Sequence, residues 1–167
     1  MTQTDLRQGF LNGMSLAAAS VSIVTTDGPA GRNGVTVSAM TPVSADGDAP
    51  TLLVCLNALA PTLPTLLENG CFCVNVLKID QAQVSDVFSG RTPAPGDDKF
   101  NIGAFSPALT GAPRFDAALV SFDCRLVSAE KIGTHHICIG AVEDVAVAPE
   151  GTPLLYGLRS YLRAEKH

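Results

Sequence analysis

Residues 31–57 read GRNGVTVSAMTPVSADGDAPTLLVCLN, and this stretch decides the predicted fold. Its first half alternates apolar with mostly hydroxyl-bearing side chains, which is typical of a β-strand with one buried face. Residues 51–56 are almost entirely apolar, and the run ends at the polar Asn57. The Gly, Pro and Asp residues between the two segments favour a turn. The stretch therefore predicts two strands with a turn between them. By itself, this pattern fits an ordinary half-buried hairpin as well as a binding site.

Outside this stretch, short apolar runs bounded by turn residues predict further strands. These runs are residues 21–26, 71–77, 117–127, 137–147 and 153–162. Many strands with few helices between them predict a mainly β chain. A small antiparallel barrel with peripheral short helices fits this pattern, and so does a sandwich.

Three short helices are predicted between the strands. Thr4 is predicted to cap the first, which would pack through the apolar side chains at helical spacing up to residue 18. The second is predicted to begin at Thr62 and to stop at Asn69 and Gly70. Asp80 is predicted to cap the third, which would end near Phe88.

Length and composition predict one domain, residues 1–167, that pairs with a second copy. Hydrophobic residues make up 46% of the chain and charged residues only 16%. A homodimer would cover part of so apolar a surface. The net charge is −5 and no run of Lys or Arg occurs, which argues against nucleic acid or an acidic membrane surface as partner.

The five cysteines all lie in apolar, strand-like runs. An odd number at such positions argues against a disulfide framework and favours reduced core thiols. Cys71 and Cys73 share a strand face, but no second pair or nearby His completes a metal site, so no metal is predicted. The chain shows neither a secretory signal nor a run long enough to span a bilayer, and we expect a cytoplasmic protein.

Residues 89–113 are rich in Gly, Pro and Asp and show no periodicity. A segment of this length either covers a functional site or is a disordered surface loop. The apolar side chains of Phe100, Ile102 and Phe105 favour docking onto the domain.

The chain resembles the flavin reductase family, the small component of two-component flavin-dependent monooxygenases. Residues 34–39 (GVTVSA) match one family motif and residues 50–57 (PTLLVCLN) match a second. The likeness continues through CVNVL at 73–77, Lys99-Phe100, LVSFDC at 119–124, IGTH at 132–135 and RSY at 159–161. It covers nearly the whole chain, and residues 24–31 bring it nearest to the reductases that serve pyrimidine-ring and hydroxyphenylacetate monooxygenases.

The resemblance implies an FMN-binding split β-barrel with two sites at a dimer interface. It also implies an enzyme that reduces FMN with NADH and releases the reduced flavin to a partner oxygenase; FAD is a possible alternative flavin. Such an enzyme needs no dinucleotide-binding G-x-G-x-x-G motif, and the chain has none, because the nicotinamide visits as a substrate.

The resemblance also assigns residues to the flavin. It places Thr36, Val37, Ser38, Ala39 and Cys55 beside the ring. Asn57 and Thr62, at the predicted start of a helix, would hold the phosphate through helix N–H groups and side-chain donors. Lys99 would approach the phosphate or the ring, although a solvated surface lysine explains it equally well.

Four further residues are assigned to NADH. The Gly-Thr-His pattern at 133–135 makes His135 the candidate catalytic residue, hydrogen-bonded to the nicotinamide or the flavin edge, and leaves His136 as an ordinary strand residue. Arg159 and Tyr161 are expected on one strand face, with Tyr156 nearby. Arg159 would bind a dinucleotide phosphate, or form a rim salt bridge instead.

Two other functions fit the same fold. One is a flavin-binding module without turnover, such as a carrier or sensor. The other is an oxidase that retains FMN and acts on an amine, although no motif favours it. A fold alone does not choose among them.

Overall fold

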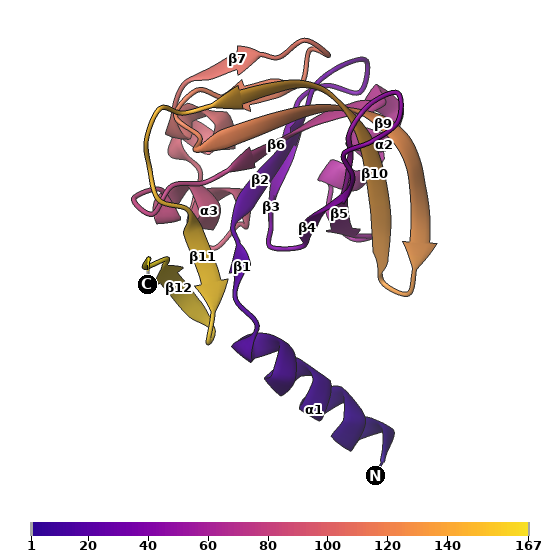
Figure 1. The fold of residues 1–167 in the computed structure, drawn as a ribbon, viewed down its shortest axis with the longest axis vertical. Coiled ribbons are helices and arrows are strands. Elements are labelled where there is room, and N and C mark those ends of the chain that lie inside the picture. The colour runs from indigo at the N-terminus through magenta and orange to yellow at the C-terminus, as the bar shows by residue number, and fades with distance from the viewer. Residues whose placement is uncertain (1, 167) are drawn as a thin grey trace.

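The computed structural model describes residues 2–166, which form one large curled antiparallel sheet and two small sheets (Figure 1). The large sheet has the order β3 (Asn33–Val37), β2 (Ser22–Thr26), β6 (Cys71–Val76), β9 (Val120–Ile132), β10 (His135–Val147), β5 (Thr51–Asn57) and β4 (Met40–Ser44). One small sheet contains β1 (Ala19–Ser20), β11 (Leu154–Gly157) and β12 (Ser160–Arg163). The other pairs β7 (Phe105–Pro107) with β8 (Pro113–Phe115).

The order of strands forces the large sheet to curl. Strands β3 and β4 lie at its opposite edges, yet only Ser38 and Ala39 connect them. Two residues span only a few ångströms of chain, so the sheet has to bend until its two edges meet. The Cys55 amide donates to the Ala39 carbonyl at 3.1 Å across this junction. The predicted mainly β split barrel is confirmed.

The predicted pairing within residues 31–57 is wrong in one respect. Strand β3 pairs with β2, and the hairpin partner of β5 is β4. The chain bends at Ser38, so the alternating run from 35 to 40 is divided between the two edges of the barrel. A period-two pattern does not show such a bend, because the side chains on both sides of it still alternate.

The barrel interior is filled by aliphatic side chains and one large aromatic, Phe72. Helix α2 (Thr62–Asn69) begins and ends where predicted and buries Leu63 and Leu66 against this core. Gly70 ends α2 in the left-handed region at φ 68°, a conformation that a residue without Cβ adopts at little cost.

Two predicted helix caps are wrong. Helix α1 (Gln3–Leu16) is capped by Thr2, whose hydroxyl accepts from the Asp5 amide while the Asp5 carboxylate accepts from the Thr2 amide. This reciprocal pair satisfies two helix-end donors. Helix α3 (Ala82–Phe88) follows Gln81, not Asp80, and has no side-chain cap.

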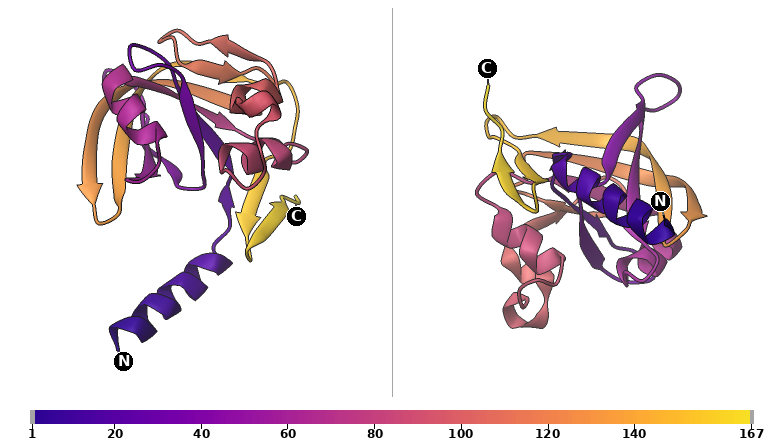
Figure 2. Two further views of the ribbon diagram at one scale, coloured as in Figure 1. Left: turned by 180° about the vertical axis from the view of Figure 1, so that it is seen from behind. Right: turned by 90° about the horizontal axis from the view of Figure 1, so that it is seen from below.

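Helix α1 does not pack onto the barrel as predicted. It extends away from the domain in Figure 1 and in the left view of Figure 2, and none of its residues is buried. Phe10 is 65% exposed and Leu16 is 70% exposed. Two hydrogen bonds attach its C-terminal half to the β11–β12 turn: the Ser15 carbonyl accepts from the Leu158 amide at 2.5 Å, and the Asn12 side chain accepts from Arg159 at 3.0 Å.

Residues 89–113 are docked on the domain, as their apolar side chains predict. They include two short 3₁₀ turns, η1 (Pro95–Asp97) and η2 (Lys99–Ile102), and strand β7. Phe100 and Phe105 stack edge-on at 4.9 Å between centroids, and both contact Phe88 of α3. The buried Asp123 carboxylate accepts from the amide and the hydroxyl of Thr110, which fixes the far end of the segment.

The C-terminal segment is two strands and not the single strand predicted for residues 153–162. Leu158 and Arg159 form the turn between β11 and β12, with φ of 52° and 59°. Consecutive positive φ values are typical of a tight hairpin turn, in which Gly or Asn is usual. Because Leu158 and Arg159 are neither, the sequence gives no turn signal here.

All five cysteines are free thiols, as predicted. Burial raises the pKa of Cys124 to about 12 and that of Cys138 to about 11, so these thiols stay protonated. Among residues 2–166, no three His, Cys, Asp or Glu side chains are placed to hold a metal ion. No helix in the described part of the chain has the length and apolarity to cross a bilayer.

Candidate functional site

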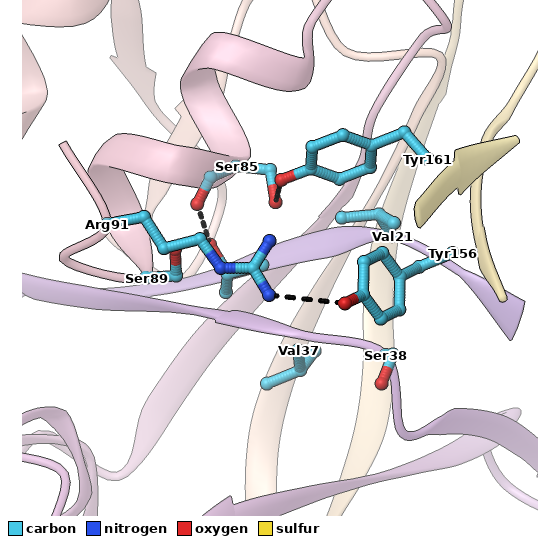
Figure 3. A pocket seen from close by; sticks show the side chains of 9 residues that line it. Val21, Val37, Ser38, Ser85, Ser89, Arg91, Tyr156 and Tyr161 are labelled. Carbon is cyan, nitrogen blue, oxygen red and sulfur yellow. Dashed lines mark hydrogen bonds between the residues drawn. The ribbon is translucent and has the colours of Figure 1, made fainter. Parts of the chain in front are cut away.

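Two neighbouring hollows open where the edges of the barrel meet, and both are lined by Thr36, Val37 and Ser38. We call the first the histidine hollow. It is also lined by Val35, Ala39, Cys55, Leu56, Asn57, Ala60 and His135. We call the second the tyrosine hollow (Figure 3), also lined by Val21, Ser85, Ser89, Arg91, Tyr156 and Tyr161. The end of β3 is therefore the common wall of both.

This wall offers backbone groups to a ligand. Strand β3 is an edge strand, paired with β2 on one side only, so its other edge carries N–H and C=O groups without a strand partner. The Thr36 hydroxyl donates to the Ser85 carbonyl at 2.7 Å and is not free. Thr36 therefore faces a ligand mainly with its backbone.

His135 reaches the histidine hollow because of strand register. It lies directly opposite Asn57, across the β10–β5 pair. Its Nδ1 is 3.0 Å from the Thr134 hydroxyl, which fixes the ring orientation and leaves Nε2 for a ligand. His136 points to the opposite sheet face and does not line either hollow.

The tyrosine hollow is built on a cross-strand pair. Tyr156 and Tyr161 face each other in the β11–β12 register, with ring centroids 5.6 Å apart. The Tyr161 hydroxyl donates to the Asp86 carboxylate at 2.6 Å and lies 2.9 Å from the Ser85 hydroxyl. Burial, and then the Asp86 carboxylate, raise the pKa of Tyr161, so this phenol stays neutral and locks β12 to α3.

Arg91 follows α3 and extends across the tyrosine hollow toward Tyr156 (Figure 3). Its Nη2 is 3.5 Å from the Tyr156 hydroxyl, and its guanidinium carbon is 5.4 Å from the centre of that ring. Nη1 is 3.7 Å from Asp86. Of the residues that line the two hollows, Arg91 is the one with a permanent positive charge.

Most of the predicted site residues lie together. The histidine hollow contains Thr36, Val37, Ser38, Ala39, Cys55, Asn57 and His135. The tyrosine hollow contains Tyr156 and Tyr161.

Three predicted residues lie outside both hollows. The Thr62 side chain is buried and donates to the Asn33 side chain at 3.0 Å. The Lys99 ammonium donates to the Gly34 carbonyl at 2.7 Å and lies over the Phe88 ring; burial lowers its pKa. Arg159 does not share a strand face with Tyr161, because it occupies the β11–β12 turn and donates to Asn12 of α1 at 3.0 Å.

Ser85, Ser89 and Arg91 also line the tyrosine hollow and were not predicted from the sequence. The available signal was the segment from 89 onward, which was predicted to cover a site and begins with two of these residues. The pairing that brings Tyr156 and Tyr161 against α3 is long-range, so no local pattern points to Ser85.

The arrangement suits the binding of flat rings and not acid–base chemistry. The histidine and tyrosine hollows measure about 220 and 180 Å³, so each by itself is smaller than the usual small-molecule site of about 300–1,000 Å³ and has room for only part of a ligand. The side chains that line them are mostly apolar or hydroxyl-bearing, and His135 is the one imidazole among them. A redox cofactor that carries the chemistry itself fits such a lining.

Comparison with known proteins gives a consistent result. The model of the flavin reductase like domain matches residues 14–165. An FMN reductase (NADH) RutF of Methylorubrum populi is 44% identical over 153 residues, covering 91% of this chain and 73% of the relative. The Enterobacter cloacae protein of the same name is 41% identical and covers 96% and 95% of the two chains.

Solved structures show the same fold. A homologue of nitrilotriacetate monooxygenase component B from Mycobacterium thermoresistibile superposes with a TM-score of 0.86 at 26% identity, covering 98% of this chain and 89% of that one. BorF, the flavin reductase component of a bacterial two-component tryptophan halogenase, superposes at 0.82 with 29% identity, covering 99% and 100%.

Proposed function

This chain belongs to the flavin reductase family, and we propose that it reduces free FMN with NADH and releases reduced flavin to a partner oxygenase. The observation that supports this most is the shared wall of the two hollows. A flavin ring in the histidine hollow and a nicotinamide ring entering from the tyrosine hollow would both lie against residues 36–38. Two flat rings that exchange a hydride have to meet face to face.

The flavin supplies the redox chemistry, because its ring accepts the hydride at N5 while NADH is oxidised to NAD⁺. The protein has to bind and orient the two rings. Backbone N–H groups along the free edge of β3 would stabilise the negative charge that develops at the N1–O2 edge. The proton that completes reduction comes from solvent, because both hollows are open.

NADH oxidation with and without added FMN tests the activity. We expect turnover that depends on added FMN, with oxidised FMN restored by air after release. A flavin carrier would bind FMN without consuming NADH. An oxidase would keep FMN through gel filtration. Absence of NADH oxidation by folded protein under both conditions would exclude a reductase.

We propose that residues 1–167 are one reductase domain that acts as a homodimer. Two apolar surfaces support this. One is the exposed face of α1, which carries Leu6, Phe10 and Met14 at a spacing of four residues. The other is an almost purely apolar groove over β4, β5, β9 and β10 that includes Phe122 and Val142. A second copy would remove both from water.

We expect sedimentation analysis to give a dimer at micromolar concentration. Replacing both Phe10 and Met14 with Ser should weaken the dimer, because each exchange removes apolar area from the proposed interface, worth about 25 cal/mol per Å². Replacing Thr4 and Gln8 of the same exposed helix with Ser is the matched control. A wild-type monomer with full turnover would contradict the proposal.

We place the reaction in the cytoplasm. Support comes from the five free thiols, which a reducing compartment preserves, and from the use of NADH.

We expect His135→Ala to lower kcat/KM for NADH by about threefold to tenfold and to change FMN affinity less. The lost interaction is one oriented hydrogen bond, worth about 0.5–1.5 kcal/mol. Steady-state kinetics with varied NADH and fluorescence titration of FMN measure the two effects.

His136→Ala is the matched control and should leave both values nearly unchanged, because its ring lies on the opposite sheet face. An equal or larger effect at His136 would show that the wrong histidine is assigned.

A further inference from the structure

We propose that Arg91 binds the diphosphate of the dinucleotide, the role that the sequence pattern gave to Arg159. This inference rests on the proposed function, because it assumes that NADH enters through the tyrosine hollow. It adds a binding residue, in the hollow that shares the wall of residues 36–38 with the histidine hollow.

Arg91 makes only weak polar interactions within the protein. Its two nearest polar partners, the Tyr156 hydroxyl and the Asp86 carboxylate, are 3.5 and 3.7 Å away, which is long for a charge-assisted hydrogen bond. The short hydrogen bond that the Asp86 carboxylate accepts comes from the Tyr161 hydroxyl and not from Arg91. A guanidinium has five N–H donors, so most of those of Arg91 are free for an incoming ligand.

Arg91 is held in place although most of its side-chain N–H donors stay available. Its amide donates to the Asp86 carbonyl at 2.9 Å, and its guanidinium lies beside the Tyr156 ring. The hydrogen bond to Tyr156 raises the pKa of Arg91 above an already high value, so the charge persists at any physiological pH. The side chain is 54% exposed, so a charged ligand reaches it from solvent.

The charge and the side chains around Arg91 also suit a diphosphate. The protein carries a net charge of −5, so a dianionic ligand needs a local cation to hold it. The forked guanidinium matches the paired oxygens of a diphosphate. Tyr156 beside it offers a ring face on which the nicotinamide or the adenine can stack.

The alternative, Arg159, is poorly placed for this role. Its guanidinium donates to Asn12 of α1 at 3.0 Å, and it does not line the tyrosine hollow. Arg159 therefore provides a matched control of the same residue type.

The test compares Arg91→Met, Arg91→Lys and Arg159→Met with the wild type. Each is measured with NADH and with N-benzyl-1,4-dihydronicotinamide, a hydride donor that has no phosphate. For Arg91→Met we expect kcat/KM for NADH to fall by about tenfold to a hundredfold. This fold-loss should be at least about ten times the fold-loss in kcat/KM for the benzyl donor. Arg91→Lys should recover part of the loss, and Arg159→Met should stay within about twofold.

Two binding measurements complete the test. Calorimetric titration of NAD⁺ should show the same loss for Arg91→Met without any turnover. Titration of FMN and riboflavin tests whether Arg91 binds the flavin phosphate instead. A loss of affinity in Arg91→Met for FMN but not for riboflavin would assign Arg91 to the flavin phosphate and overturn the proposal. Equal losses with both hydride donors, or no loss of NAD⁺ binding, would also overturn it.

The proposed function can fail separately. If the wild type bound NAD⁺ through Arg91 but did not oxidise NADH with FMN, the dinucleotide site would stand and the reductase activity would not.

Discussion

Replacing Asn75 with Ala is expected to lower the free energy of unfolding by about 3 kcal/mol. Asn75 is fully buried in β6. Its side-chain oxygen accepts from the Phe115 amide and from the Ser121 hydroxyl, both at 2.8 Å. Its amide nitrogen donates to the Thr25 hydroxyl at 3.1 Å. A buried donor left without an acceptor costs about 1–3 kcal/mol, and the exchange leaves two such donors.

The loss should appear in urea denaturation as a lower midpoint with little change in slope. Asn101→Ala is a suitable control, because Asn101 is exposed and its side-chain amide donates only one bond, to the Pro95 carbonyl at 2.9 Å. It should cost less than about 0.5 kcal/mol. Ser121→Ala removes a hydroxyl donor and its hydrogen bond to Asn75 at once, so no buried donor is left without an acceptor. It should therefore lower the free energy of unfolding less than Asn75→Ala does. A loss below about 1 kcal/mol for Asn75→Ala would mean that the network contributes little.

Two buried polar side chains, Asn75 and Asp123, explain why residues 89–113 could be predicted to dock but not where they dock. The apolar side chains of Phe100, Ile102 and Phe105 predict from sequence alone that the segment packs against the domain. The position of that contact is fixed by pairing across the chain, since the Phe115 amide binds Asn75 and Thr110 binds Asp123. A buried Asn on a central strand signals a polar network, and its partners come from far along the chain.

The residues of the histidine hollow were predicted through the family motifs at residues 34–39, 50–57 and 132–135, because the alternation of residues 35–40 by itself fits an ordinary hairpin. The structure brings these three segments to one hollow, with His135 opposite Asn57 across the β10–β5 pair. The tyrosine hollow was not predictable in the same way. Arg159 and Tyr161 are two residues apart, and the prediction of a common face assumed an unbroken strand. The turn at Leu158 and Arg159 reverses the chain there and turns Arg159 toward α1.

The start of α2 leads to the last prediction, on how strongly FMN is preferred over riboflavin. If the flavin phosphate lies at this helix start, few donors meet it. Pro61 and Pro64 have no N–H group. The Thr62 hydroxyl already donates to the Asn33 side chain, and the Asn57 side-chain oxygen already accepts from the Leu59 amide at 2.9 Å. Ala58 supplies no side-chain donor.

We therefore expect FMN to bind no more than about a hundredfold more tightly than riboflavin, and FAD to be reduced as well. Each hydrogen bond to a charged group is worth about 1.5–3 kcal/mol, and 1.4 kcal/mol is about tenfold in affinity, so one or two such bonds account for the limit. Ala58→Ser adds a hydroxyl between Asn57 and the start of α2, at a side chain that is partly buried against the barrel core. It should tighten FMN without tightening riboflavin, whereas the exposed Ala104→Ser should change neither.

Fluorescence titration of both flavins against the three proteins measures these differences. A wild-type preference far above a hundredfold would mean that the phosphate is bound elsewhere than at α2. Arg91→Met and Lys99→Met would then separate the candidates, because the first removes the cation of the tyrosine hollow and the second removes the ammonium beside Gly34. Equal tightening of FMN and riboflavin by Ala58→Ser would mean that the new hydroxyl contacts the ring or the ribityl chain and not the phosphate.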